Sequence, residues 1–253
     1  MDKVVVPLGE QLDDYQITRD RDLPPVFWET CTKKGLFGML IPKEYGGLGF
    51  SAYMHSQVVQ VMSSRSSSAS STVTVPNSLG PAELLVRYGT PDQKQYWLPK
   101  LAKGELIPAF GLTAPHSGSD AASMVGSDGI VVEKDGKLGI VASFKKRFIT
   151  LAPVAGVIGV AFNLTDPNNL LKGKGESGIT VVLLERDHPG LIVGPRHDPL
   201  TASFMNGTVV GENVFIPIDS VIGGQERCGF GWNMVMECLA EGRAVSLPSS
   251  AVG

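Results

Sequence analysis

The first hundred residues carry apolar side chains at helical spacing. Val26, Phe27 and Cys31 recur at this spacing after two prolines, and a glycine then offers a stop, which predicts a helix over 23–35. A serine cap followed by a second apolar stripe predicts another helix over 51–65.

The serine-rich run at 63–71 has two interpretations. A flexible linker is the usual meaning of low complexity. Val73 and Val75 nevertheless resume the apolar pattern at once. We favour a buried helix that packs closely through small side chains, and we keep the linker as the alternative.

Two further short helices are expected over 81–88 and 91–102. The second has a complete start signal, because Thr90 is placed to cap it, a proline follows at the first helical position and Gln93 stands third.

After residue 106 the hydrophobic period changes from helical to two. Turn-forming pairs such as Asp135-Gly136 separate short β-type runs over 107–112, 130–133, 138–143, 156–162, 179–184, 191–193, 208–210 and 213–216. Because no long helices intervene, these runs predict an antiparallel sandwich or barrel and not a parallel doubly wound sheet.

A last apolar stripe predicts a helix over 231–252 that is interrupted or kinked near Pro248. A lone terminal helix must dock, so it folds back or a following domain is missing, and we favour the missing domain. The predicted fold class is α+β. It has an N-terminal all-α domain (1–106), an antiparallel β-barrel or sandwich domain (107–226) and the first helix of a truncated C-terminal helical bundle (227–253).

Composition and charge exclude several classes of protein for this chain. With 43% hydrophobic residues the chain can build a core, and a net charge of −3 draws it neither to nucleic acid nor to an anionic membrane. Its longest apolar run, 152–162, is shorter than the ~20 residues of a spanning helix. We find no secretory signal, and three unclustered cysteines suit a reducing compartment. These features predict a soluble, cytoplasmic protein.

Two further features of the sequence do not indicate a binding site. The segment 173–178 matches G-x-G-x-x-G by letters, but turn residues precede it and a strand follows, so we reject a dinucleotide site. The histidines lack ligand spacing, and we therefore expect no metal; they are His55, His116, His188 and His197.

The most informative segment is the polar stretch 110–120. A strand ends at Thr113, Pro115 turns the chain, and 117–119 is expected to expose backbone N–H groups and two hydroxyls. Such a loop can bind a phosphate or the polar edge of a planar ring. By itself, a plain β-turn explains it equally well.

Other motifs favour a ligand-binding loop over a plain β-turn. Together with this loop, and in the same order and spacing, four segments resemble the acyl-CoA dehydrogenase family of flavoproteins over nearly the whole chain: Ile41–Gly49, Tyr88–Lys94, Lys146–Thr150 and Phe215–Pro217. Two more segments are similar to the bacterial fatty-acid enzymes of that family, Phe204–Gly207 and Met236–Leu239.

The resemblance implies a helical domain, a β-domain and a C-terminal bundle, with FAD between the last two. It places the 112–113 loop at the pyrimidine edge of the flavin, Ser119 at a phosphate or the CoA-bearing ligand, and Phe148 and Thr150 against the isoalloxazine ring. The cofactor-binding residues it implies are Leu112, Thr113, Gly118, Ser119, Phe148, Ile149 and Thr150.

The chain departs from the family pattern at three places. Ala114 stands where Glu is usual, and Leu151-Ala-Pro153 replaces an Asn-containing turn. Phe148 replaces Trp, which keeps the aromatic face but loses the indole donor. We expect flavin binding to survive with an altered environment.

The implied reaction is FAD-dependent α,β-dehydrogenation of a fatty acyl-CoA to a trans-2-enoyl-CoA in fatty-acid β-oxidation. A carboxylate removes the α proton while a hydride leaves the β carbon, and fixed donors must polarise the thioester carbonyl. By resemblance, electrons pass to an electron-transferring flavoprotein, and the full-length protein is a homo-oligomer.

The catalytic base is not assigned. Most family members carry it in the C-terminal bundle, and a minority carry it immediately before an arginine that Arg243 resembles. Gly242 occupies that position here, and Glu241 is one residue away, a rotation of ~100° on a helix. A surface role for Glu241 is the interpretation we favour, with Arg243 as an organiser of the site.

Two other functions remain open. The chain could be a non-catalytic scaffold module of the same fold, or part of a flavin-dependent acyl-CoA oxidase. Retention of Thr113, Gly118, Ser119 and Thr150 argues against a decayed scaffold.

Overall fold

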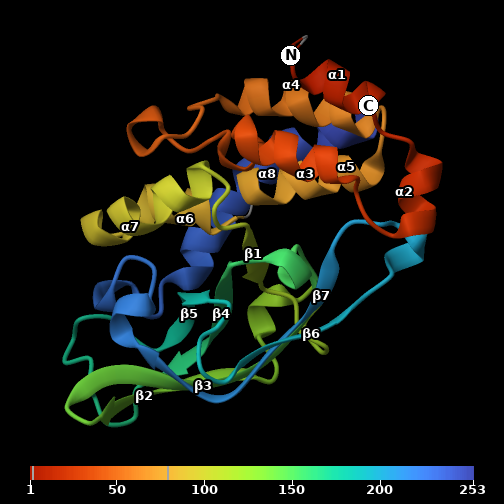
Figure 1. Cartoon of the computed structure of the whole chain (residues 1–253). Helices are drawn as coiled ribbons and strands as arrows, with labels where there is room; N and C mark the ends of the chain where they lie inside the picture. The colour runs from red at the N-terminus through yellow and green to blue at the C-terminus, as the bar shows by residue number, and fades with distance from the viewer. Residues whose placement is uncertain (2, 79) are drawn as a thin grey trace.

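The computed structural model describes residues 1, 3–78 and 80–253, without the side chains of Thr201 and Glu241. Its α-helices are α1 (Val5–Glu10), α2 (Asp14–Asp20), α3 (Pro25–Lys33), α4 (Ala52–Ser63), α5 (Ser67–Thr74), α6 (Pro81–Tyr88), α7 (Pro91–Ala102) and α8 (Gly231–Val252). Figure 1 shows a helical layer lying over a curled sheet, with both chain ends at the helical side.

The sheet has seven strands in the order β1-β4-β2-β3-β7-β6, and β5 pairs with β4 off this path. The strands are β1 (Pro108–Gly111), β2 (Ser127–Lys134), β3 (Lys137–Thr150), β4 (Val157–Thr165), β5 (Gly178–Glu185), β6 (Leu191–Arg196) and β7 (Asn206–Pro217). Residues from β3, β4 and β7 form a core cluster within the sheet, among them Phe144, Phe162 and Val209. A second cluster joins Val157 and Ala161 of β4 to the helices α6, α7 and α8.

The α+β class is confirmed, whereas the purely antiparallel pairing is wrong. β4 runs parallel to both β1 and β2, and its other pairing, with β5, is antiparallel. The runs predicted over 208–210 and 213–216 form one strand, β7. Pairing direction depends on which segments meet in space, and the alternation of residues within one strand carries no such information.

Several predicted helix starts are confirmed in atomic detail. The Ser51 hydroxyl accepts a hydrogen bond from the Met54 amide at 3.3 Å. Thr90 and Gln93 form a reciprocal capping box at the start of α7. These signals are local, so the sequence alone predicts them well.

The serine-rich run is a helix and not a linker. Ser66 caps α5, and Ser68, Ala69 and Val73 are buried. The Ser68 hydroxyl accepts a hydrogen bond from the Ser203 amide at 3.0 Å, which ties α5 to the chain between β6 and β7. Small side chains therefore let this helix pack tightly, as we expected.

Two helices before residue 23 were not anticipated. α1 contains Pro7 within its first turn, where a proline is tolerated. The Asp13 carboxylate caps α2 by accepting hydrogen bonds from the amides of Tyr15 and Gln16. The cap at Asp13 was the signal available in the sequence.

The terminal helix α8 folds back onto the chain and is continuous through Pro248, so the predicted interruption is wrong. It packs against α4, α6 and β5, and Tyr88 of α6 donates a hydrogen bond to Glu237. Pro248 removes the backbone donor for the carbonyl of Ala244, and both residues are exposed.

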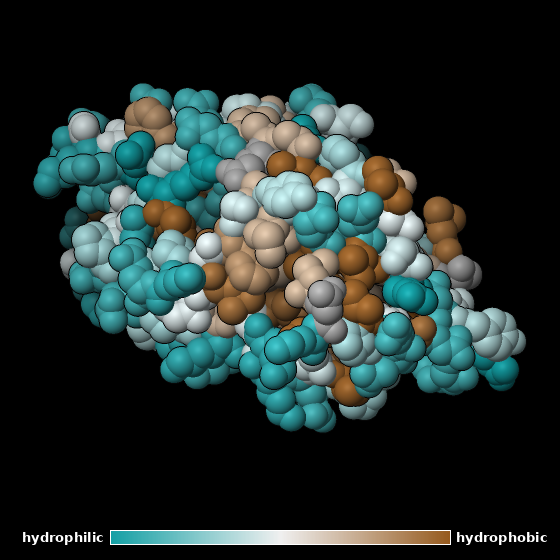
Figure 2. Space-filling model, turned by 90° about the horizontal axis from the view of Figure 1, so that it is seen from above, coloured by the Kyte–Doolittle hydropathy of each residue, from teal (hydrophilic) through white to brown (hydrophobic). Residues whose placement is uncertain are grey.

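The outer face of the helical layer is partly apolar. Figure 2 looks down on this layer and shows hydrophobic surface gathered in the middle of the face among hydrophilic residues. Near the end of α8, Leu247 and Val252 are 61% and 72% exposed. The division of the chain near residues 106 and 226 stays a prediction.

Candidate functional site

The polar loop after β1 and the last residues of β3 lie side by side. The Arg147 amide donates to the Thr113 carbonyl at 3.0 Å, and the Lys146 ammonium donates to the Leu112 carbonyl at 3.1 Å. The two stretches are therefore adjacent where Leu112 and Thr113 meet Lys146 and Arg147, and the flavin-binding roles of their residues stay predictions. We call residues 112–119 and 148–150 together the wall.

Phe148 is the most unusual residue of the wall. It sits at a bulge, where the β3–β7 register shifts between Lys146 and Ile149, and its φ is +59°. Its ring is 54% exposed, meets the His197 ring at 5.3 Å edge to face and lies 4.8 Å from the Arg147 guanidinium carbon. A bulky residue with positive φ on an exposed bulge is typical of a functional surface.

The turn at 114–119 holds its own backbone in place. Ala114 and Ser117 exchange two backbone hydrogen bonds, of 3.2 and 3.3 Å. The Ser117 hydroxyl is buried and accepts from the Val125 amide at 2.8 Å. The expected exposure of two hydroxyls is therefore wrong, because Ser119 alone of this pair is exposed. A Cβ at Gly118 would meet no atom within 4 Å, so its surface is open.

Ile149 and Thr150 point in different directions. The Ile149 side chain is buried in the sheet core, which leaves its backbone as the group it can offer a ligand. The Thr150 hydroxyl accepts from the Asn206 amide group at 3.4 Å and also faces a cavity. Sequence alternation predicts this opposite orientation of neighbours on a strand.

That cavity, of about 360 Å³, lies between α5, α8 and the end of β3; we call it the α5–α8 cavity. It is lined by Ser70, Ser71, Thr74, Val75, Ser78, Thr150, Phe204, Leu239, Gly242, Arg243, Ser246, Leu247 and Ser250. The structure thus brings the predicted residues Thr150 and Arg243 to one space. The sequence analysis missed the serine and threonine lining, because α5 and α8 are far apart in the chain.

The candidate base is not resolved by this geometry. Glu241 lies on α8, but its side chain is outside the described part of the structure. At the next position, a Cβ on Gly242 would stand 3.1 Å from Cβ of Ser78, so α8 approaches the chain closely here. Arg243 lines the cavity from an exposed position. The roles of both residues stay predictions.

Lys146 supports the wall from inside. Its side chain is completely buried, and burial lowers its pKa to about 8, although the carboxylate of Asp128 opposes that shift. Besides the Leu112 carbonyl, its ammonium lies 3.7 Å from the Met124 sulfur. Lys146 stands two residues after the buried Phe144, so both side chains lie on the same face of β3. This spacing was the sequence signal for its burial.

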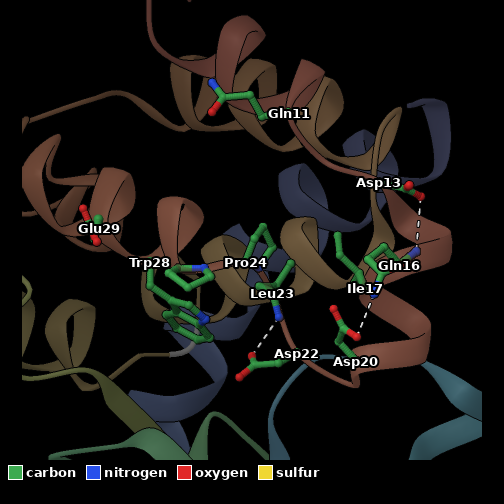
Figure 3. A pocket seen from close by; sticks show the side chains of 11 residues that line it. Gln11, Asp13, Gln16, Ile17, Asp20, Asp22, Leu23, Pro24, Trp28 and Glu29 are labelled. Carbon is green, nitrogen blue, oxygen red and sulfur yellow. Dashed lines mark hydrogen bonds between the residues drawn. The ribbon is translucent and has the colours of Figure 1, made fainter.

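A second hollow, of about 620 Å³, lies beside α2 and α3 (Figure 3) and contains none of the predicted site residues. Its acidic side chains have local partners. Asp13 caps α2, Asp20 accepts from the Gln16 side chain at 2.8 Å and Asp22 accepts from the Leu23 amide at 2.7 Å. These carboxylates are explained by the local fold.

Two kinds of feature are absent from the described residues. In that part of the chain, no helix combines the length and apolar character needed to cross a membrane. The same residues contain no group of three or more His, Cys, Asp or Glu side chains placed to hold a metal ion.

The helical layer on a curled mixed sheet, with a wall at the end of β3, defines a known class of fold. Residues 1–105 match the family model "Acyl-CoA dehydrogenase, N-terminal domain". An acyl-CoA dehydrogenase of Bacillus subtilis is 31% identical over 222 residues, covering 87% of this chain and 54% of that protein. These matches support the assignment of the chain to the acyl-CoA dehydrogenase family.

Two further similarities bear on this assignment. Protein HemX of Proteus mirabilis is 46% identical over 93 residues, 37% of this chain and 55% of its own length. The crystal structure of an acyl-CoA dehydrogenase from Bacillus anthracis, complexed with FAD, is similar with a TM-score of 0.77 and 25% identity. That similarity covers 97% of this chain and 39% of that one. The chain spans about half the length of the curated relatives it matches.

Proposed function

We propose that this chain carries the flavin-facing and acyl-facing parts of an enzyme that converts a fatty acyl-CoA to a trans-2-enoyl-CoA with FAD. One observation carries the proposal: the backbone hydrogen bond between Arg147 and Thr113 brings the polar loop next to the end of β3, where Phe148 is exposed and Thr150 lines the α5–α8 cavity. The match to the family model and the FAD complex of the Bacillus anthracis relative support it.

The residues of the wall fit a flat, polar-edged ring with a phosphate-bearing tail. Phe148 offers an exposed aromatic face, and Gly118 offers an open surface for close approach. In the described structure the Arg147 Nε atom is buried without a hydrogen-bond partner, which leaves a donor for a bound oxygen. When bound, FAD supplies the hydride acceptor for the reaction.

The residues of the chain then have defined tasks. Leu112 and Thr113 present the backbone that borders the ring, with Lys146 fixing the Leu112 carbonyl. Thr150 borders the ring and the cavity at once. Ser119 stands on the exposed side of the loop, where a phosphate or the CoA portion of a substrate can reach it. Ile149 contributes through its backbone.

The proton-transfer step needs a carboxylate that the described side chains do not identify. Glu241 is the candidate within this chain, and Arg243 is placed to orient the groups at the mouth of the cavity. The base must reach the α carbon and be partly removed from water, because burial raises its pKa toward that needed for proton abstraction.

The wider role is proposed on resemblance. It comprises fatty-acid β-oxidation in the cytoplasm, electron transfer to an electron-transferring flavoprotein, and a homo-oligomeric whole protein. Each element rests on the family and on the motifs similar to the bacterial fatty-acid enzymes.

Reconstitution of the purified chain with FAD tests the proposal. We expect weak FAD binding, seen as a perturbed flavin absorption band, and very slow reduction of an artificial electron acceptor with acyl-CoA. Rapid turnover by this chain would contradict the view that its catalytic base lies elsewhere. Failure of both FAD and acyl-CoA to bind a longer chain would favour the scaffold alternative, and hydrogen peroxide production would favour the oxidase.

A further inference from the structure

We infer that the α5–α8 cavity selects an acyl group that carries an oxygen-containing polar group, and that Thr74 and Ser246 are the residues that recognise this oxygen. The inference rests on the proposed function, because Thr150 makes the cavity continuous with the wall. It specifies the class of acyl substrate, which the family assignment leaves open.

Two hydroxyls of the cavity are buried without a partner. Among the described residues, Thr74 Oγ1 and Ser246 Oγ have almost no solvent contact and no hydrogen bond. The whole Ser246 side chain is 3% exposed, and both residues line the cavity. Unpaired buried hydroxyls are uncommon in folded proteins, since each costs about 1–3 kcal/mol.

Neighbours on the same two helices show what these hydroxyls usually do. In α5, the Thr72 hydroxyl donates to the carbonyl four residues earlier, that of Ser68, at 2.8 Å. In α8, the Ser249 hydroxyl donates to the Val245 carbonyl at 2.7 Å. Helical serine and threonine commonly bond back in this way. Thr74 and Ser246 do not, so their hydroxyls keep unused hydrogen-bonding capacity beside the cavity, which a ligand can use when the side chain turns toward it.

Other hydroxyls of the cavity are already engaged. The Ser70 hydroxyl pairs with that of Ser63 at 2.6 Å, and the Ser250 hydroxyl donates to the Leu247 carbonyl at 3.0 Å. The polar capacity that is buried and unused is therefore concentrated at Thr74 on α5 and Ser246 on α8. These two helices contact each other and form opposite sides of the cavity.

The remaining lining limits what the ligand can be. Val75, Phe204 and Leu239 give the cavity apolar surface, which favours a ligand with a hydrocarbon body. A plain alkyl chain would leave both hydroxyls without a partner, as they are in the ligand-free structure. A carbonyl, hydroxyl or ether oxygen on that body would accept their hydrogen bonds. The matching substrate is an oxygen-bearing acyl thioester.

Ligand-free stability gives the first test. Thr74→Val and Ser246→Ala remove unpaired buried hydroxyls, so each is expected to leave the melting temperature unchanged or raise it by about 2 °C. Thr72→Val and Ser249→Ala are the matched controls, which lose a hydrogen bond and are not expected to raise it. A fall in melting temperature for Thr74→Val and Ser246→Ala, as large as in the controls, would show that these hydroxyls are bonded within the protein and would overturn the inference.

Ligand preference gives the second test, on the full chain by calorimetric titration. One pair of probes is cyclohexanone and methylenecyclohexane, which have similar shapes and differ in one oxygen. The other pair, titrated in excess FAD, is 5-oxohexanoyl-CoA and hexanoyl-CoA. We expect the oxygen-bearing member of each pair to bind about tenfold tighter. The double variant Thr74→Val/Ser246→Ala should lose this preference, and Thr72→Val/Ser249→Ala should keep it.

The outcomes separate the two proposals. Equal or tighter binding of hexanoyl-CoA would overturn the inference and leave the proposed function intact. A preference for cyclohexanone, lost in the double variant, with no binding of either thioester would support recognition of oxygen and contradict the acyl-CoA function. No preference within either pair would overturn the inference.

Discussion

The wall and the α5–α8 cavity are neighbours, yet they are built in contrasting ways. The wall consists of two short segments, each with a recognisable local motif, joined by the hydrogen bond between Arg147 and Thr113. The cavity is formed mainly by two helices separated by more than half of the chain, and its polar lining comes from scattered serines and threonines. A motif indicates the kind of ligand, whereas the assembled cavity determines which member of that kind fits.

The two regions also differ in how they treat polar groups. Behind the wall, the buried Lys146 ammonium donates a hydrogen bond to the backbone carbonyl of Leu112. In the cavity, Thr74 and Ser246 keep their hydroxyls unbonded within the described structure. We therefore expect substitutions behind the wall to change the shape of a site, and substitutions in the cavity to change its selectivity.

The largest expected effect concerns Lys146 and pH. Its pKa is lowered from 10.5 to about 8 in the folded protein, so between these pH values the unfolded chain binds the additional proton. Lys146 should therefore increase the free energy of unfolding as the pH rises across this window, by about 3 kcal/mol, whereas Cys31 and Cys228, whose thiol pKa is raised by burial, act in the opposite direction above pH 9. Chemical denaturation at several pH values should show that this rise is absent in Lys146→Met and present in Lys145→Met, where the side chain is exposed. If the free energy of unfolding depended on pH equally in the two variants, burial would not lower the pKa of Lys146 as described.

The next effect concerns the bond that joins α5 to the sheet. Ser68→Ala leaves the Ser203 amide without its acceptor, which should lower the free energy of unfolding by about 2 kcal/mol. The exposed neighbour Ser67→Ala is the control and should change stability by less than about 0.5 kcal/mol. If thermal melting gives the same value for both, the serine-rich helix is not anchored as described.

A third effect isolates the aromatic face of the wall. Phe148→Ala should weaken FAD binding about tenfold, because the ring is exposed and contributes little to the core. Phe148→Trp keeps the aromatic face and should retain the affinity. Fluorescence titration with FAD measures both, and an unchanged affinity in Phe148→Ala would remove this residue from the proposed site.

The smallest effect on stability belongs to Gly118. Since a Cβ there meets no atom within 4 Å, Gly118→Ala should change the free energy of unfolding by less than about 0.5 kcal/mol. If FAD approaches this backbone closely, the added methyl group should nevertheless weaken FAD binding severalfold. Loss of stability without loss of affinity would indicate a purely structural turn.

Sequence reasoning succeeds here where the cause is local. The caps at Ser51 and Thr90 and the helix within the serine-rich run, α5, are confirmed. The contact between the two wall segments is not local, and it was expected only from the family resemblance. Burial of Lys146 was not predicted, because the predicted strand ended at residue 143, whereas the observed strand continues through Thr150.

Where the cause is an encounter of distant segments, the sequence is silent. The parallel pairing of β4 depends on partners that its own residues do not specify. The route of α8 through Pro248 depends on packing against α4, which supports a helix that propensity alone would end. The α5–α8 cavity exists because these helices meet, and no motif marks Thr74 or Ser246.

Hydrogen–deuterium exchange with and without a large excess of FAD tests the central claim most directly. If the wall binds the flavin, added FAD should slow exchange chiefly in residues 112–120 and 147–151, with little change in α2 and α3 beside the second hollow. Protection confined to other segments, with the two stretches of the wall exchanging as fast as before, would contradict the account.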